Sequence, residues 1–305
     1  MDQAEQLRNI IKSNSQNAKP LARIITVTSG KGGVGKSNTS INLAVQLKRL
    51  GKRVIILDAD FGLANIEIMF GTMPKFNLSD LIYQGKNIRD IITWGPGGIG
   101  FISGGSGIAG LSNLSRDYLA YIIQNLSELD AIADVIIIDT AAGISDAVLE
   151  FLVASGEILL VTTPEPTSIT DSYSLLKALN NHPKFMREST QIRMVANRVE
   201  TAEEGENLFH KLDTVVARYL RMKIQYLGSV PYDTQLSSAV MQQMPVSLQS
   251  PKSKSAHAYA EIAARLLNRE QNTNQERHGM AAFLAHIVSG KKGVIYGNGF
   301  RRKDH

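Results

Sequence analysis

Cysteine is missing from this chain of 305 residues. Its absence excludes disulfide bonds, zinc sites made of thiolates and iron–sulfur clusters held by cysteine. An iron–sulfur reductase is therefore excluded as a function. A chain that cannot form disulfides also fits the reducing environment of the cytosol.

Long hydrophobic runs are missing as well. The longest apolar stretches hold about five residues, whereas a membrane-spanning helix needs roughly twenty. The first residues, MDQAEQLRNIIK, have acidic and amide side chains where a signal peptide has its apolar core. We therefore expect a cytoplasmic protein that meets a membrane only peripherally, at its inner face.

The apolar residues, 43% of the chain, gather in short runs rich in isoleucine and valine. These runs do not alternate with polar residues, which is typical of strands buried on both faces. Helical patterns such as Thr39–Leu50 and Ser168–Leu179 lie between them. The alternation predicts an α/β fold, a mostly parallel twisted sheet with helices on both faces. The predicted strands are Arg23–Val27, Arg53–Leu57, Val135–Asp139, Glu157–Val161, Ile192–Ala196 and Ile224–Val230.

A phosphate-binding loop follows the first predicted strand. The sequence GKGGVGKS at Gly30–Ser37 matches the P-loop pattern, and Thr39–Leu50 supplies the helix that must come next. Glycines let backbone N–H groups turn towards phosphates, and the helix N-terminus adds partial positive charge. Lys36 would reach the β- and γ-phosphates of ATP, and Ser37 would hold Mg²⁺. A second lysine, Lys31, has no evident use within its own loop.

Three aspartates follow predicted strands. Asp58 and Asp60 belong to LDADFGLAN (Leu57–Asn65), and Asp139 belongs to IIIDTAAG (Ile136–Gly143). Ligands on parallel sheets bind beyond the carboxyl ends of the strands, where these side chains would emerge. We expect one carboxylate of the first pair to orient the attacking water and the other to join the metal shell. Asp139 is expected to bind Mg²⁺ through water.

Together these motifs resemble the MinD/ParA family of P-loop ATPases, which carry a deviant Walker A loop with an extra signature lysine. DADFGLAN is similar to the family's switch I and DTAAG to its switch II. ANR (Ala196–Arg198) and VPYD (Val230–Asp233) are similar to the segments that hold adenine. The resemblance covers about Leu21 to Leu267. It implies the nucleotide-binding residues Gly30, Lys31, Gly32, Gly33, Val34, Gly35, Lys36, Ser37, Asn38, Asn197, Arg198, Pro231, Tyr232 and Asp233.

The resemblance also implies a mechanism. ATP would bring two subunits face to face, and Lys31 of each would cross to the phosphates of the other. Asp60 aligns with the water-activating aspartate, Asp58 with its neighbouring carboxylate, and Asp139 with the magnesium carboxylate of switch II. The implied catalytic residues are Lys31, Lys36, Asp58 and Asp60, and the implied metal residues are Ser37, Asp58 and Asp139.

Within the family, the FlhG (FleN/YlxH) subfamily is the best match. DQAEQLR (Asp2–Arg8) resembles its activation helix, and WGPGGI (Trp94–Ile99) and PEPTSITDSYSLLK (Pro164–Lys177) are also similar. The resemblance implies control of flagellar number and placement, with the GTPase FlhF, basal-body components and in some bacteria a flagellar transcription activator as partners. The residues implied in binding FlhF are Asp2, Gln3, Ala4, Leu7 and Arg8.

The N-terminal segment also has a helical pattern of its own. Asp2 and Glu5 can form a capping box, and Leu7, Ile10 and Ile11 share one face. A helix of about ten residues is too short to be stable alone. We expect it to fold on a partner, although packing on its own domain remains an alternative.

The C-terminal segment GMAAFLAHIVSGKKG has one apolar stripe followed by two lysines. Its formal charge is positive, as is that of the chain at +5, which favours an anionic surface. We expect a reversible membrane-targeting helix, with docking in a groove of its own fold as the alternative. The residues expected at the membrane are Met280, Phe283, Leu284, Ile287, Val288, Lys291 and Lys292.

The sequence therefore predicts a partner-activating segment at 1–20, an ATPase domain at 21–267, a polar linker at 268–279 and a membrane helix with basic tail at 280–305. A DNA- or cargo-partitioning ATPase of the ParA type and a division-site ATPase of the MinD type are alternatives. Direct nucleic-acid binding is not expected, because the positive charge lies beside apolar residues at the C-terminus. A biosynthetic ligase would need a substrate pocket for which no motif stands out.

Overall fold

The computed structural model describes residues 21–60, 65–104, 123–268 and 279–289. The predicted partner-binding residues Asp2, Gln3, Ala4, Leu7 and Arg8 lie outside this part, as do Lys291, Lys292 and the side chain of Val288. The predicted linker at 268–279 is also mostly outside it.

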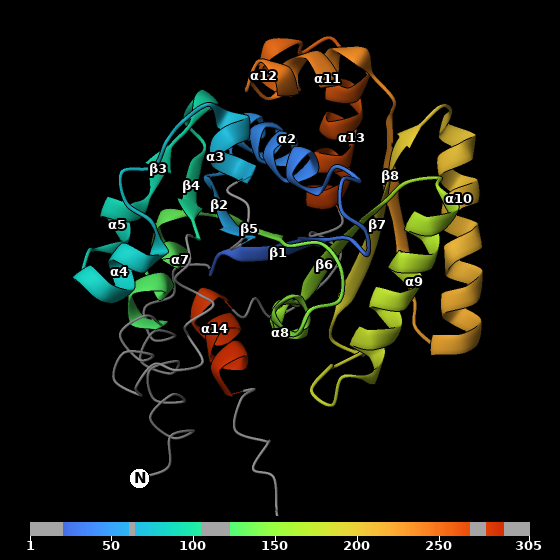
Figure 1. The fold of residues 1–305 in the computed structure, drawn as a ribbon, viewed down its shortest axis with the longest axis horizontal. Coiled ribbons are helices and arrows are strands. Elements are labelled where there is room, and N and C mark those ends of the chain that lie inside the picture. Colours follow the sequence, from blue (N-terminus) through green and yellow to red (C-terminus); the bar gives the residue numbers. More distant parts are fainter. Residues whose placement is uncertain (1–20, 61–64, 105–122, 269–278, 290–305) are drawn as a thin grey trace, which may run out of the picture.

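An eight-stranded sheet forms the centre of the molecule, in the order β3-β4-β2-β5-β1-β6-β7-β8 (Figure 1). Every neighbouring pair is parallel except β3 and β4. The predicted α/β class and all six predicted strands are confirmed. The strands are β1 (Arg23–Thr28), β2 (Val54–Ala59), β3 (Thr93–Trp94), β4 (Gly100–Ser103), β5 (Val135–Thr140), β6 (Glu157–Thr162), β7 (Gln191–Val199) and β8 (Gln225–Pro231).

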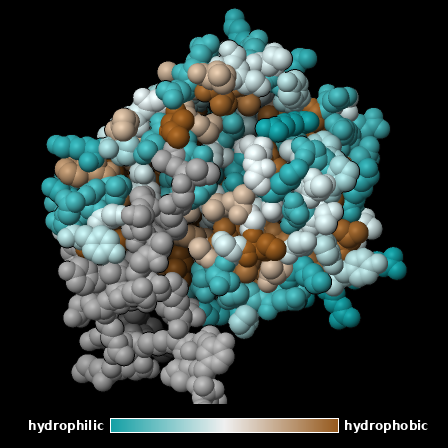
Figure 2. Space-filling view, in the orientation of Figure 1, coloured by the Kyte–Doolittle hydropathy of each residue, from teal (hydrophilic) through white to brown (hydrophobic). Residues whose placement is uncertain are grey.

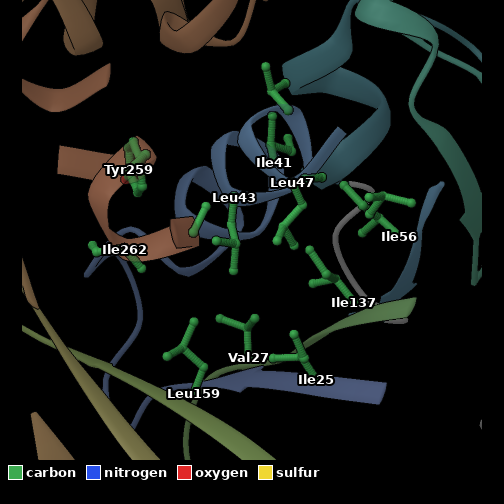
Figure 3. Packing of buried hydrophobic residues seen from close by; sticks show 14 of the residues in the cluster. Ile25, Val27, Ile41, Leu43, Leu47, Ile56, Ile137, Leu159, Tyr259 and Ile262 are labelled. Atoms are coloured by element: carbon green, nitrogen blue, oxygen red, sulfur yellow. The ribbon is translucent and has the colours of Figure 1, made fainter. Parts of the chain in front are cut away.

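Helices cover both faces of the sheet. On one face lie α2 (Lys36–Arg49) and α13 (Lys254–Asn268), with α3 (Asn65–Phe70), α11 (Thr234–Met241) and α12 (Val246–Gln249) beside them. The core on this face joins Leu43 and Leu47 of α2 to Ile25 of β1 and Ile262 of α13 (Figure 3). Because α2 is buried along most of its length, it can hold the loop before it in a fixed position.

The opposite face carries two groups of helices. One group packs on β6 and β7 and contains α8 (Asp146–Ala154), α9 (Pro166–Asn181) and α10 (Ala202–Val215), followed by the π-helical segment Val216–Leu220. The other covers β2 and β4 and contains α4 (Leu78–Gln84), α5 (Ile88–Ile91), α7 (Leu129–Ile132) and α14 (Gly279–Ser289). The outer surface in Figure 2 shows small separate apolar groups among polar residues.

The C-terminal helix α14 docks on its own domain. Met280, Phe283, Leu284 and Ile287 are buried in the core with residues of α4, α7 and β2. Both carboxylate oxygens of Asp130 in α7 accept the backbone N–H of Met280 at 3.1 Å. The predicted apolar stripe is therefore a single face, and in this structure it contacts protein. None of the described helices is long and apolar enough to cross a bilayer.

Candidate functional site

The P-loop lies between the carboxyl end of β1 and the start of α2. Gly33 and Gly35 have φ of 77° and 95°, a left-handed conformation that glycine adopts without strain. Gly35 is the N-cap of α2 and provides no side-chain cap, so the first N–H groups of the helix remain available to an anion. The helix begins at Lys36, three residues earlier than the pattern predicted.

Two glycines of this loop allow other segments to approach its backbone. A Cβ on Gly30 would lie 2.2 Å from backbone atoms of Asp171 in α9. A Cβ on Gly35 would lie 2.3 Å from Nδ2 of Asn197, and this amide donates to the carbonyl of Val34 at 2.7 Å. The loop is thus held from one side by α9 and from the other by the end of β7.

Asp139 connects the sheet to the P-loop helix. Its carboxylate accepts from the hydroxyl of Ser37 at 2.6 Å and from that of Ser40 at 2.7 Å. Ser37 and Ser40 are three residues apart, so they share a face of α2. Sequence reasoning assigned Ser37 and Asp139 to one magnesium site and missed Ser40, although its spacing from Ser37 was the available signal.

Asp58 lies directly beside Asp139, because these two residues pair in the register of β2 and β5. Burial, reinforced by the charge of Asp139, raises the pKa of Asp58 to about 7. Burial also raises the pKa of Asp139, against the effect of its two hydroxyl donors. Two buried carboxylates beside a serine hydroxyl form an oxygen site whose negative charge a divalent cation would offset, so these residues fit Mg²⁺.

Asp60 lies just beyond the end of β2. Its backbone N–H donates to Oδ1 of Asp58 at 3.1 Å, and its Oδ2 accepts from Nδ2 of Asn65 at 3.1 Å. The two contacts fix the start of the predicted switch I, whose next residues 61–64 are outside the described part. The predicted switch II is attached to the residue before the P-loop, since Gly143 donates its N–H to the carbonyl of Ser29 at 3.0 Å.

The two lysines of the loop lie in different environments. Lys36 is buried, with 8% of its side chain exposed, and its charge acts on Asp139. Lys31 turns to α9, where its ammonium contacts Glu165 at 2.6 Å and Thr167 at 2.8 Å. Lys31 lowers the pKa of the exposed Glu165 carboxyl. Glu165 and Thr167 were not among the predicted site residues, since no sequence spacing relates them to the P-loop.

Among the residues predicted to hold adenine, Asn197 contacts the P-loop, and the others differ in exposure and contacts. Arg198 is exposed and has φ of 58°, an uncommon value for a residue with a side chain. Tyr232 is 62% exposed and available to a ligand. Asp233 instead joins α11 to α13: its Oδ2 accepts the N–H and hydroxyl of Ser255 at 3.0 and 2.8 Å.

Comparison with known proteins finds a family model and relatives that match most of the chain. A family model described as the CobQ/CobB/MinD/ParA nucleotide binding domain matches residues 25–246. The antiactivator FleN of Pseudomonas aeruginosa is 43% identical over 244 residues, 80% of this chain and 86% of FleN. The flagellum site-determining protein YlxH of Helicobacter pylori is 30% identical over 297 residues, 94% of this chain and 98% of YlxH.

A solved structure of the septum site-determining protein MinD from Pyrococcus horikoshii, complexed with Mg-ADP, has a similar fold. The TM-score is 0.64 at 23% sequence identity, and the match covers 81% of this chain and 96% of that MinD. At this identity the likeness supports the fold.

The raised pKa of Asp58 predicts that its charge destabilises the metal-free protein. The folded-state pKa of about 7 exceeds the ordinary 3.8, so the contribution of Asp58 to stability is fully present at low pH and is lost as pH rises through about 7. Asp58→Asn should therefore stabilise the protein at about pH 8 in the absence of Mg²⁺, by on the order of 2 kcal/mol. The gain should shrink towards about pH 4, as measured by urea unfolding.

Asp146→Asn is the matched control, because Asp146 is exposed at the start of α8. That variant should follow the wild-type curve. A gain of Asp58→Asn that is the same at all pH values, or no gain at all, would contradict the burial argument.

Proposed function

Since the chain belongs to the MinD/ParA family of P-loop ATPases, in the branch of FleN and YlxH, we propose that it is an ATP-driven dimerising switch controlling flagellar number and placement. The chain is an ATPase. The role in flagellation rests on the likeness to FleN and YlxH over most of the length of both proteins. Dimerisation rests on the second lysine of the loop.

In this proposal the P-loop binds the ATP phosphates through its backbone N–H groups, and Lys36 neutralises the β- and γ-phosphates. Ser37, Asp58 and Asp139 would hold Mg²⁺, which when bound offsets phosphate charge. Asp60 would orient the attacking water, and its position next to Asp58 supports that role. Asn197 and Arg198 would contact the adenine, with Pro231, Tyr232 and Asp233 completing that side.

Dimerisation would require Lys31 to change partners. In the single chain its ammonium is held by Glu165 and Thr167 on the surface. A bridge between exposed groups contributes little stability, because water solvates both charges well. The phosphates of a second subunit carry more negative charge than one glutamate, so Lys31 would leave Glu165 when ATP brings two subunits together.

The two ends of the chain would respond to this pairing. Residues 280–305 would attach the dimer to an anionic membrane surface at the inner face of the cell membrane, after α14 leaves its groove. Dimerisation presents two such helices and raises the avidity.

The N-terminal segment 1–20 would stimulate a GTPase partner of the FlhF type. Removing Met1–Ile11 should abolish that stimulation and leave basal ATPase intact; unchanged stimulation would refute the assignment.

The central test is the oligomeric state with and without ATP. Asp60→Ala should bind ATP and hydrolyse it poorly, so that ATP converts this variant to a stable dimer in gel filtration. Lys36→Ala should stay monomeric with ATP, because the phosphates lose their principal cation. Normal dimer formation by Lys36→Ala would refute the site assignment, and wild-type turnover by Asp60→Ala would show that another group orients the water.

The ion pair between Lys31 and Glu165 leads to a prediction about the ATP concentration that dimerisation needs. Glu165→Gln removes the charge that holds Lys31 on its own subunit, so dimers should form at lower ATP concentration. The expected decrease is roughly two- to fivefold, in keeping with an exposed ion pair. Glu203→Gln, which changes an exposed glutamate of α10, is the control and should have no effect. An increase in the ATP requirement of Glu165→Gln would mean that Glu165 supports the dimer instead.

The membrane role is tested by deleting Gly279–His305. The truncated protein should dimerise with ATP and fail to co-sediment with vesicles that contain phosphatidylglycerol. Since α14 also covers apolar core residues, urea unfolding of the truncated protein is a necessary companion measurement. Co-sedimentation equal to that of the full chain would refute the membrane helix.

A further inference from the structure

A pocket lies at the amino ends of the strands, away from the P-loop. Its volume is about 370 Å³, within the size range of single-ligand sites. The pocket begins where α2 ends, and α2, with 14 residues, separates it from the P-loop by about 21 Å. The residues that line it include Lys48, Lys52, Arg53, Trp94, Gly98 and Ile132.

Three cationic side chains surround this pocket. Arg53 is fixed: its guanidinium contacts Asp134 at 2.7 Å and the carbonyl of Ala131 at 2.9 Å. Lys48 places its ammonium on the carbonyl of Gly98, which is a neutral acceptor. Lys52 acts on the same carboxylate as Arg53. Among the described residues, Asp134 is the carboxylate that interacts with two of these three cations, Arg53 and Lys52.

The positive charge at the pocket exceeds what would offset the helix dipole at the C-terminal end of α2. Basic residues in the last turn of a helix stabilise its dipole, and α2 has both Lys48 and Arg49 there. Arg49 already donates to the carbonyl of Ser247 at 2.6 Å, on the other side of the helix end. Lys52 and Arg53 follow the helix, so the charge at the pocket exceeds what the dipole requires.

Trp94 forms an aromatic wall of the pocket. It is the single tryptophan of the chain, and 60% of its surface is exposed. The ring packs over Gly100, where an added Cβ would lie 3.3 Å from it, so the indole is supported from beneath. An exposed tryptophan next to lysines is typical of surfaces that contact the interface of a bilayer, since the ring is apolar and its N–H is polar.

The pocket shares one end of the molecule with the C-terminal helix. Ile132 of α7 lines the pocket, and Asp130 of the same short helix binds the first turn of α14. The end of α13 is at this side too, because Arg23 at the start of β1 donates to the carbonyl of Leu266 at 3.0 Å. The chain therefore leaves the ATPase domain at the same end of the sheet.

From this arrangement we propose that Lys48, Lys52 and Trp94 form a binding site for the phosphate of an anionic lipid headgroup. The site rests on the proposed membrane association and assigns a contact face to the ATPase domain itself. The lysines bind the phosphate, Arg53 keeps the loop after α2 in place through Asp134, and the indole lies among the headgroups. The P-loop then faces away from the bilayer.

The single tryptophan makes this contact directly measurable. Full-length protein is titrated with vesicles of phosphatidylglycerol in phosphatidylcholine, with ATP present, while Trp94 emission is recorded. The emission should shift to shorter wavelength with anionic vesicles and stay constant with phosphatidylcholine alone. Trp94→Phe, which has no tryptophan, confirms the origin of the signal.

Charge variants measure the contribution of the lysines. Lys48→Ala and Lys52→Ala should each weaken binding to anionic vesicles roughly fivefold, and the effect should decrease with added salt. Lys211→Ala and Lys223→Ala are matched controls, because they remove exposed lysines on or near α10. Both controls should bind as wild type does. The ATPase activities and urea midpoints of both controls should also be unchanged.

The outcomes separate this proposal from the membrane role itself. If the protein sediments with anionic vesicles and Trp94 emission does not change, this face is not in contact and the proposal alone fails. If the protein does not sediment with anionic vesicles, both the headgroup site and the proposed membrane role fail. If glycerol 3-phosphate or AMP shifts the emission and vesicles do not, the pocket binds a soluble phosphate and the lipid assignment is overturned.

Discussion

The site depends on one buried carboxylate, that of Asp139, in the middle of the sheet. It accepts hydrogen bonds from Ser37 and Ser40, so the first turn of α2 is attached to β5 as well as to the loop. The strand order places β5 between β1 and β2, which brings the P-loop and Asp58 to its two sides. A fully buried charge is costly unless it is paired. The same cost that destabilises the site without a cation would give it affinity for one.

The P-loop is held by α9 with two contacts of very different strength. Gly30 meets the backbone of α9 at a distance that leaves no room for a side chain, so this contact is rigid. Lys31, the next residue, is joined to the same helix through exposed charges, and such a contact is easily exchanged. A rigid contact beside an exchangeable one lets the lysine move without moving the loop. This is a suitable arrangement for a lysine that serves two subunits in turn.

The six longer strands and the P-loop were predictable because their signals are local. A run such as Val135–Asp139 is apolar on both faces, and the loop pattern fixes its own neighbours. β3 and β4 were not predicted, since they contain two and four residues and include Gly100. The partner of Lys31 is 134 residues away, and no periodicity relates the two. The apolar stripe of α14 was visible, but a stripe of this kind fits a protein groove or a bilayer equally well, so the sequence alone left its contacts open.

For α14, burial of the apolar stripe in the groove and its transfer into lipid can be compared as free energies. Burying Met280, Phe283, Leu284 and Ile287 contributes roughly 1.5–3 kcal/mol for each side chain, and transfer of the same side chains into lipid returns a similar amount. The apolar terms of the helix itself nearly cancel, whereas the groove residues that α14 covers would be exposed to water if the helix left. Asp130, which binds the N–H of Met280, favours the groove. Two helices in the proposed dimer would favour the membrane, because the second would attach without a new loss of translational freedom. In the proposed dimer, the number of linked helices, and not their chemistry, would be what shifts this balance towards the membrane.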